Sequence, residues 1–214
     1  EGSAAIATVG GRGKGEREFM VAEVPDCVEL VENDPADAYL VFTTTHDGTG
    51  SIECLFTPIR VVCQNTMTAA LRGATNRIKL RHTASAPDKL KLAHTVLASN
   101  RAYWDRIRHA YAYMAKKDLS RMDTIELVEK LFPGESTRGQ NIRKEVLILA
   151  NGALKGRSTA KVGTAYGLFN AITEYIDHER TTRNGNTNFE ASMFGSGAKL
   201  RQDAFDLLTT GMSG

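Results

Sequence analysis

The stretch AYLVFTTTHDGTGSIECLFTPIR, residues Ala38–Arg60, contains two extended segments separated by a turn. The first segment, AYLVFTTT, is rich in β-branched and aromatic residues, which favour strands. Gly48 and Gly50 lie between the segments, and glycine supplies the positive φ that a tight hairpin turn needs. The sequence therefore predicts an antiparallel hairpin whose tip contains His46 and Asp47.

The adjacent His46 and Asp47 also suggest a metal site, because a His-Asp pair can bind a metal ion for phosphate-ester hydrolysis. In enzymes of that type the pair lies on a helix with further ligands on neighbouring helices, whereas here it lies between strands. Of the other histidines, His94 and His109 lie in a basic helical segment without a carboxylate at ligand spacing. We therefore expect no bound metal and no cofactor, and the turn is the favoured local interpretation.

The rest of the first third also has the character of strands. The runs SAAIATV and EREFMVAEV flank the glycine-rich GGRGKG of residues 10–15, which predicts a second hairpin. The acidic, proline-marked stretch Pro25–Ala36 is expected to form a loop, with CVELV as an alternative strand inside it. The run SIECLFTPIRVV is expected to lose its ladder at Pro58, because proline has no N–H to donate. NRIKLRHT is again extended in character.

From about residue 60 the apolar residues change to helical spacing. The longest periodic segment, residues 87–117, contains two seven-residue series: Leu90, Leu97, Trp104 and Tyr111, and Ala93, Asn100, Ile107 and Met114. Such a heptad seam predicts a helix of about 30 residues that packs lengthwise on another helix, and it offers a surface for a homo-oligomer. Its cations lie mostly away from the seam, where they are solvated or face a partner.

Three or four shorter helices are expected after it. DTIELVEKLF begins with an Asp123…Glu126 capping pattern, and RGQNIRKEVLILANG has Ile142, Val146 and Leu149 at helical spacing. STAKVGTAYGLFNAITEYIDHER places Val162, Ala165 or Tyr166, Phe169, Ile172 and Ile176 on one face, and its small residues Gly163 and Gly167 would let another backbone approach. AKLRQDAFDLL follows a glycine break.

These elements predict an α+β fold. A small antiparallel sheet of hairpins in the first third is followed by a mostly helical remainder with one long amphipathic helix. Residues 1–85 would hold the sheet and one helix, VVCQNTMTAALRG, and residues 86–214 a helical region packed on it in one continuous domain. No apolar run reaches the ~18 residues of a transmembrane helix.

Charge is distributed unevenly, although the formal net charge is only +2. Residues 1–58 carry 3 Lys/Arg and 11 Asp/Glu, residues 59–121 carry 13 and 3, and residues 122–214 carry 11 and 11. A basic middle part favours a surface that faces a polyanion. Internal pairing with the acidic first third is the competing interpretation.

Five cations near the junction of sheet and helices are the candidates for polyanion binding. They are Arg60, Arg72, Arg77, Lys79 and Arg81. In an extended RIKLR segment, alternation sends Arg77, Lys79 and Arg81 to one face. Three like charges on one face repel unless an anion lies there, and a phosphate backbone would serve.

A second group consists of polar residues that could share a site. Its members are His46, Asp47, Asn65, His82, Asp177 and His178. Within TEYIDHER, Glu174 shares a helix face with Asp177 or His178, an arrangement of carboxylate and histidine suited to acid–base chemistry. A solvated helix terminus is the favoured interpretation of that segment.

Several long blocks of this chain resemble a known family. THDGTGS…TPIRVVCQNTMTAAL, RHT, GTAYGLFNAITEYIDHER and FGSGAKL are similar to the signature blocks of a phage- and plasmid-related family catalogued as domain of unknown function 932, from about Thr8 to Leu208. Members usually have a region ahead of the point where this chain begins, so the resemblance implies a fragment. Because His46 and Asp47 lie in a signature block, it also implies that they face a shared polar site with Arg60 and His82.

The phage and plasmid context implies work on mobile DNA in the cytoplasm of a bacterial host. We expect a DNA-binding protein without enzymatic activity, in the manner of a single-strand annealing or recombination accessory protein, with single-stranded DNA favoured over double-stranded DNA. Part of this expectation rests on an analogy of fold, which does not establish function. The alternatives are a nucleic-acid- or nucleotide-processing enzyme with a His/Asp/Glu site, and an oligomeric assembly or host-interaction protein.

Overall fold

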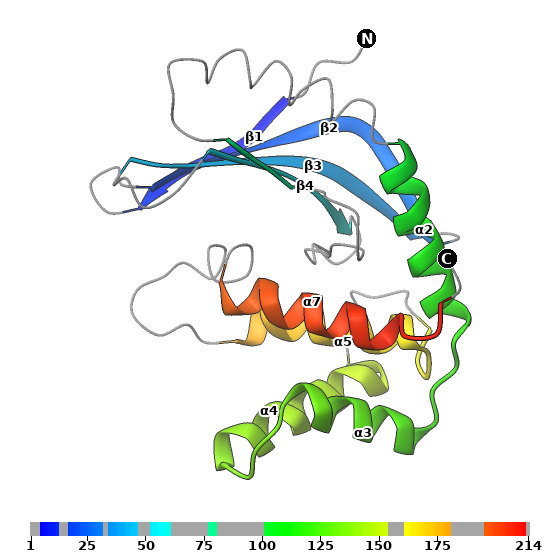
Figure 1. Ribbon diagram of the computed structural model, residues 1–214. Helices are drawn as coiled ribbons and strands as arrows, with labels where there is room; N and C mark the ends of the chain where they lie inside the picture. The colour runs from blue at the N-terminus through cyan, green and yellow to red at the C-terminus, as the bar shows by residue number, and fades with distance from the viewer. Residues whose placement is uncertain are drawn as a thin grey trace.

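Of the 214-residue chain, the computed structural model describes residues 5–12, 17–31, 34–46, 52–60, 77–80, 101–153, 161–180 and 195–212. In this part of the chain an antiparallel sheet forms one layer and helices form a second layer beneath it (Figure 1). One helix, α2, runs alongside both layers. The predicted α+β class, with a small antiparallel sheet in the first third and a mostly helical remainder, is confirmed.

The sheet is a meander in which the strands lie in the order of the chain. They are β1 (Ala5–Arg12), β2 (Arg17–Val31), β3 (Asp34–Thr45), β4 (Ile52–Arg60) and β5 (Arg77–Leu80), each antiparallel to its neighbour. Val21 of β2 pairs with Val41 of β3, and the two are 4% and 1% exposed. Phe19 and Tyr39 pack beside them, so the two longest strands form the centre of the sheet.

The prediction of a loop over Pro25–Ala36 is wrong. β2 continues through Pro25 to Val31, and β3 follows almost at once. The register shifts between Val24 and Cys27, which places Pro25 in a β-bulge. A bulged residue is left out of the ladder, so a proline there removes no interstrand hydrogen bond and the strand can continue past it.

The other proline expected to interrupt a strand, Pro58, also lies inside a ladder. It pairs with Ala38 of β3, and β4 continues to its end at Arg60. The β4–β5 ladder covers only Ile52–Leu55, so at Pro58 the strand is an edge on that side within the described sheet. An edge position tolerates proline because no second neighbouring strand needs its N–H.

Both predicted hairpins are confirmed. β3 and β4 pair directly, so His46 lies in the connection between them. β1 and β2 also pair directly, although the first three residues of GGRGKG continue β1 as part of the ladder. The remaining connecting residues, 13–16 and 47–51, lie outside the described part of the chain.

The helical layer is built around α5, all 10 residues of which are buried. The helical segments described are α2 (Arg101–Lys116), α3 (Arg121–Leu131), α4 (Thr137–Ile148), the π-helical turn η1 (Leu149–Ala153), α5 (Ala165–Glu174), the π-helical turn η2 (Tyr175–Glu179) and α7 (Ser196–Leu208). The Tyr111 ring of α2 contacts Tyr166 and Phe169 of α5 and Phe205 of α7, with centroids 5.8, 5.9 and 5.9 Å apart. Figure 1 shows α3 and α4 on the side of α5 and α7 away from the sheet.

Three heptad residues of α2 are buried inside the chain. Ile107, Tyr111 and Met114 are each 0% exposed, in the core that α2 shares with α5 and α7. α2 also contacts β2, and Val31 at the end of β2 packs against this core. The described part of the seam therefore connects sheet and helices within one chain. The part of the predicted 87–117 helix that precedes α2 lies outside the described residues.

The capping pattern predicted for α3, Asp123…Glu126, is wrong by one turn. The N-cap is Ser120, and Asp123 is the third residue of a capping box. The Ser120 hydroxyl accepts from the Asp123 N–H at 3.1 Å, and the Asp123 carboxylate accepts from the Ser120 N–H at 3.0 Å. Hydrogen bonds to Ser120, the larger effect from its side chain and the smaller from its backbone, lower the pKa of the Asp123 carboxyl. The stability that this cap contributes is therefore fully present above the ordinary pKa of an aspartate. It is lost as the pH falls through the lowered pKa of Asp123 in the folded protein.

α5 begins later than the sequence predicts. Its N-cap is Thr164, and Val162, expected on the buried face, is 51% exposed. Gly163 has a φ of +78°, a left-handed conformation that a continuous helix does not contain. Beyond the cap the face is buried as predicted at Ala165, Tyr166, Phe169, Ile172 and Ile176.

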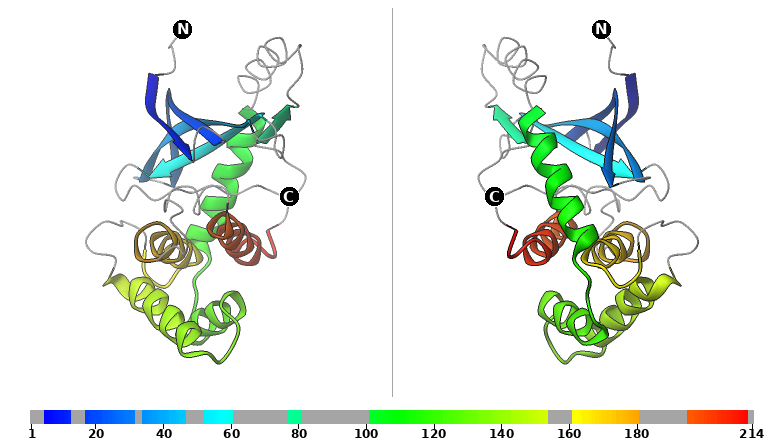
Figure 2. Two further views of the ribbon diagram at one scale, coloured as in Figure 1. Left: turned by 90° about the vertical axis from the view of Figure 1, so that its left-hand side faces the viewer. Right: turned by 90° about the vertical axis from the view of Figure 1, so that its right-hand side faces the viewer.

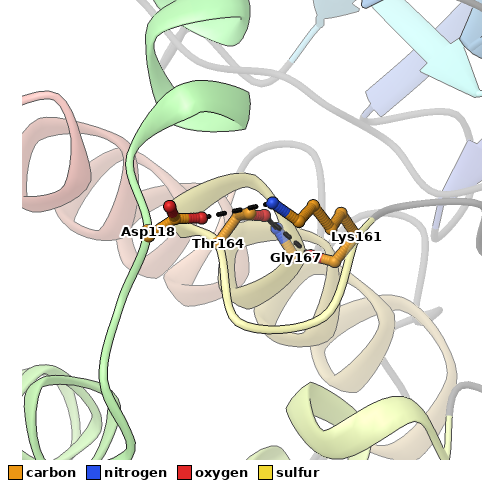
Figure 3. Close-up of polar contacts among 4 residues, drawn as sticks. All are labelled: Asp118, Lys161, Thr164 and Gly167. Atoms are coloured by element: carbon orange, nitrogen blue, oxygen red, sulfur yellow. Dashed lines mark hydrogen bonds and ion pairs between the residues drawn. The ribbon is translucent and has the colours of Figure 1, made fainter.

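A short antiparallel bridge ties the start of α5 to the chain that leaves α2. The bridge pairs Asp118 with Thr164. Its backbone hydrogen bonds run from the Leu119 N–H to the Gly163 carbonyl at 2.8 Å and from the Ala165 N–H to the Lys117 carbonyl at 2.9 Å. Lys161 Nζ lies 3.4 Å from Asp118 Oδ1 (Figure 3), but these side chains are 75% and 78% exposed, so their ion pair adds little to the bridge.

The Thr164 hydroxyl closes this junction from inside. It donates to the Lys161 carbonyl at 2.7 Å and accepts from the Gly167 N–H at 3.0 Å (Figure 3). A Cβ on Gly167 would lie 2.5 Å from the Lys161 oxygen, so only glycine fits there. The predicted close backbone approach at Gly167 is confirmed.

Thr164→Ala should lower the free energy of unfolding by about 1–2 kcal/mol, because it removes a buried N-cap. Thr164→Ser keeps the hydroxyl and should recover most of that loss. Urea unfolding followed by circular dichroism measures both. Ser136→Ala, which removes the exposed cap of α4 with its single bond of 3.2 Å to the Gly139 N–H, is the matched control. A cost at Thr164 no larger than the cost at Ser136 would contradict the role given to the buried hydroxyl.

Candidate functional site

Three of the five predicted DNA-binding cations have backbone positions in the sheet. Arg60 is the last residue of β4, Arg77 is the first residue of β5, and Lys79 lies within β5. The other two, Arg72 and Arg81, lie outside the described residues.

The register separates Arg60 from the β5 cations. Arg77 pairs with Leu55, which is five positions before Arg60 on β4. At ~3.4 Å per residue this is a separation of about 17 Å along the strand. Because positions alternate between the faces of a strand, an odd separation also assigns Leu55 and Arg60 to opposite faces. Arg60 is therefore not part of the face to which Arg77 and Lys79 belong.

Lys79 is directly opposite Glu53 of β4. Residues directly opposite each other in an antiparallel pair share a face, and opposite charges at such positions attract. Glu53 is half-buried. The register thus places Lys79 opposite an acidic residue of the first third of the chain.

The polar candidates are divided between the two layers. His46 follows β3, and its Nε2 lies 3.5 Å from Glu18 Oε2, with both side chains about half exposed. Asp177 and His178 belong to η2 in the helical layer. Asp47, Asn65 and His82 lie outside the described residues.

The described residues contain no group of three or more His, Cys, Asp or Glu side chains arranged to hold a metal ion. His46 has a carboxylate neighbour in Glu18, and a single pair of this kind lies below the usual number of protein ligands for a metal. Within the same ranges, no helix has the length and apolar character needed to cross a membrane.

A row of deeply buried polar side chains lies along α5. Asn170 and Thr173 are 0% exposed and Glu174 is 1% exposed. The Asn170 amide donates to the Tyr166 carbonyl at 2.8 Å, and the Thr173 hydroxyl donates to the Asn170 carbonyl at 2.9 Å. Burial of polar groups is tolerated because they are hydrogen-bonded within the helix itself.

This row continues into η2, where a buried ion pair joins it to α7. Asp177 Oδ1 lies 2.7 Å from Arg201 Nη2, and the two side chains are 8% and 0% exposed. Both residues and Glu174 have further interactions within the chain. The favoured sequence interpretation, a solvated helix terminus, is wrong for Glu174 and Asp177 and holds only for the exposed His178.

Arg201 is the residue of this cluster that sequence reasoning missed. A signal was present, because Arg201 lies at helical spacing with Ala204, Phe205 and Leu208, which are the apolar residues that α7 buries. A cation in the middle of an apolar helix face requires an anionic partner inside the protein. The sequence does not say which carboxylate provides it.

The π-helical turn η2 positions the carboxylate. A π-helical turn contains more residues than an α-helical turn and redirects the residues that follow, and such turns often occur at functional sites. Here the turn brings Asp177 to Arg201, while Tyr175 packs edge-to-face on Phe132 with centroids 6.0 Å apart. Burial raises the pKa of the Tyr175 hydroxyl, so it stays protonated at neutral pH. These groups bind one another and give the cluster a structural role.

The outward side of α2 presents a different kind of surface. Residues 101–117 carry five Lys or Arg and a single acidic residue, Asp105. We call the exposed positions Arg106, Arg108, His109 and Lys116 the α2 basic face. Figure 2 (right) shows α2 in front of both layers, running from the sheet to the helices. This face therefore runs along one side of the molecule from the sheet toward α5 and α7.

The contacts that Arg108 and the neighbouring Lys117 make within the chain do not cancel the positive charge of the α2 basic face. Arg108 lies 3.4 Å from Asp105, a pair whose side chains are 51% and 68% exposed and which solvent therefore screens. Lys117, beside the face, donates to the carbonyls of Leu208 and Thr210 at 3.1 and 3.3 Å and so caps the end of α7. Lys117 is committed to the fold, whereas the side chains of the four residues of the α2 basic face are exposed.

A small cavity lies near the start of α3. Its volume is about 130 Å³, and Arg121, Thr124, Asn151, Val162 and Leu168 are among the residues that line it. Ligand pockets for nucleotides or drug-sized molecules usually enclose roughly 300–1,000 Å³. The cavity is therefore too small for such a ligand, and the α2 basic face is the better candidate site.

Asp177→Ala should lower the free energy of unfolding by about 3–5 kcal/mol, because the Arg201 charge stays buried without this carboxylate. Urea unfolding monitored by circular dichroism gives the value. The control is Asp105→Ala, which removes the exposed partner of Arg108 and should change stability by no more than about 0.5 kcal/mol. Equal small losses in the two variants would show that the buried pair is not a major support of the helical layer.

Comparison with known proteins gives a family for this chain. A family model described as "Domain of unknown function (DUF932)" matches residues 1–194. No curated protein and no solved structure matches the chain. The family expected from the sequence blocks is the one found, and because its model covers most of the 214 residues, the chain belongs to the DUF932 domain-of-unknown-function family.

Proposed function

We propose that this protein binds DNA through the α2 basic face and has no catalytic role in doing so. The observation that carries the proposal is the charge of α2, where five cations and one carboxylate lie within residues 101–117. The buried side of the helix is apolar and packed, and the three cations Arg106, Arg108 and Lys116 are exposed. An excess of one sign on an exposed surface attracts a polyanion over several ångströms.

The length of the α2 basic face suits a phosphate backbone. Arg108 and Lys116 are eight residues apart, which at ~1.5 Å per residue places them about 12 Å apart along the helix. Phosphates of one strand recur every ~3.4 Å along B-form DNA, so the face spans several of them. Each cation that neutralises a phosphate releases a counterion, and this release supplies affinity that does not depend on base sequence.

The cations of the sheet have a secondary place in this proposal. Lys79 is opposite Glu53, and Arg60 belongs to another face of the sheet. The cations of the sheet therefore do not form one cluster, in contrast to the exposed cations of α2. Arg72, Arg77 and Arg81 stay predictions from the sequence. A role in annealing or recombination on phage or plasmid DNA, in the cytoplasm of a bacterial host, is the finer form of the proposal. It is supported by the family resemblance of the sequence blocks.

The enzymatic alternative receives less support. It requires His46 to meet Asp177 and His178 in one pocket, yet His46 is at the sheet beside Glu18, and Asp177 is taken up by Arg201. A general acid or base must also reach its substrate. Asp177, with a side chain only 8% exposed, is poorly placed for that.

The test is a titration of labelled single-stranded and double-stranded oligonucleotides, followed by fluorescence anisotropy, at several salt concentrations between about 50 and about 200 mM. The unmodified chain should bind with a steep negative dependence of the logarithm of the association constant on the logarithm of salt concentration. The double variant Arg108→Gln/Lys116→Gln should lower that slope by about 1.4 for single strands, at ~0.7 per phosphate contact. At about 0.1 M salt this is a loss of about 25-fold in affinity, equal for all sequences.

The matched control is Lys130→Gln/Lys144→Gln, which removes the same charge from exposed positions of α3 and α4. It should leave the slope almost unchanged, because these helices lie away from the proposed surface. An unmodified chain that fails to bind at low salt would overturn the proposal. Equal losses in the two double variants would show that any binding follows net charge and not the α2 basic face.

A further inference from the structure

The edge strand β1 presents an uncovered apolar surface. It is the outermost strand of the described sheet and forms one border of it (Figure 2, left). Ile6 and Val9 of this strand are 65% and 67% exposed. An edge strand offers a row of unpaired backbone N–H and carbonyl groups, and proteins usually protect such edges with charged residues or proline. From Ala5 to Gly11 the strand has neither.

A β-bulge brings the two exposed residues to the same side. Ile6 pairs with Ala22 and Val9 pairs with Met20, and the register shifts between Ile6 and Thr8. Ala22 and Met20 are two positions apart and share a face of β2, so their partners share that face as well. Without the shift, Ile6 and Val9 would lie on opposite faces. The bulge therefore produces a short apolar stripe along the outer border of the sheet.

The other face of β1 is closed near its end by an aromatic ring. A Cβ on Gly10 would lie 2.3 Å from the Phe19 ring, so Gly10 is the residue that lets this ring lie across the strand. Phe19 itself packs against the Val21–Val41 pair at the centre of the sheet. β1 is thus held on its inner side and on one face, whereas no described strand pairs with its outer edge and the Ile6–Val9 stripe is exposed.

We propose that β1 pairs antiparallel with β1 of a second copy of this chain, joining two sheets into one continuous sheet. In the proposed register, Ile6 of one copy lies opposite Val9 of the other. Because the pairing has twofold symmetry, Val9 of the first copy lies opposite Ile6 of the second, which gives the same apolar pair twice. Between these two pairs, Ala7 of each copy lies opposite Thr8 of the other. Cross-strand pairs of β-branched residues are a main stabilising unit of antiparallel sheets.

The bulge favours a second copy over an unrelated strand. A regular strand laid on β1 would lose register at the shift between Ile6 and Thr8, which is how bulges protect an edge. A second β1 carries the same extra residue, and the twofold axis places the two irregular segments opposite each other. The ladder then stays in step on both sides. Isologous pairing of this kind closes on itself and yields a dimer.

The dimer should be a weak one. A single edge ladder with two apolar pairs buries much less than the ~1,200–2,000 Å² of a standard stable interface. Association is therefore expected in the micromolar range or weaker. The proposal does not depend on DNA binding, because the α2 basic face belongs to another element of the structure.

Sedimentation equilibrium of the 214-residue chain over a wide range of concentration tests the pairing. The unmodified chain should show a concentration-dependent monomer–dimer equilibrium. Ile6→Lys/Val9→Lys places like charges opposite each other twice and should weaken dimerisation about tenfold or more. Ile6→Lys/Val9→Glu places opposite charges at the same positions and should restore a large part of the association. All of these substitutions are at exposed positions, so the fold should survive them, and circular dichroism checks it.

The control is Met122→Lys, which replaces a residue on α3 that is 65% exposed and should leave the equilibrium unchanged. A chain that stays monomeric at every concentration overturns the proposal. So does an equal loss of association in the Lys/Lys and Lys/Glu variants, because the proposed register requires the two to differ. Weaker association of Met122→Lys would assign the interface to the helical layer and would equally overturn the pairing through β1.

Discussion

α5 is enclosed by protein on every side, and this constraint determines how the helical layer is built. A helix without contact to water must satisfy the polar groups at both ends from within the protein. At the start, the Thr164 hydroxyl and the backbone bridge to Lys117 and Leu119 meet this need. At the end, η2 continues the helix, so that the Tyr175 N–H donates to the Ala171 and Ile172 carbonyls, and the same turn brings Asp177 to Arg201 of α7. The neighbours of α5 are thus fixed by polar contacts at its two termini as well as by the aromatic core between them.

Local patterns were sufficient to predict most of the fold. Strands followed from the period-two runs and the glycine turns, and buried helix faces followed from residues such as Val146 and Leu149, which are 0% and 2% exposed. The errors arose where a local rule depended on context. Proline ends a strand only where a ladder partner needs its N–H, and neither Pro25 in its bulge nor Pro58 at an edge meets that condition.

The candidate sites were harder to predict because their properties depend on residues distant in sequence. Asp177 looked like part of a solvated terminus, and only the packing of α7, 24 residues later, makes it one half of a buried ion pair. Likewise the run of alternating cations in β5 contains no information about Glu53, which becomes opposite to Lys79 through the strand register. The outward charge of α2 was readable from the sequence. Its position beside both layers was not.

The two sides of α2 link any ligand of its outer face to the stability of the whole molecule. The inner side supplies Ile107, Tyr111 and Met114 to the core, and the helix also contacts β2. Unfolding would therefore scatter the outer residues and remove the ligand's binding surface. A molecule that binds only the folded arrangement raises the free energy of unfolding by an amount that grows with the logarithm of its concentration. Binding of a ligand to this single helix would then make both the sheet and the helical layer more resistant to heat and to proteolysis.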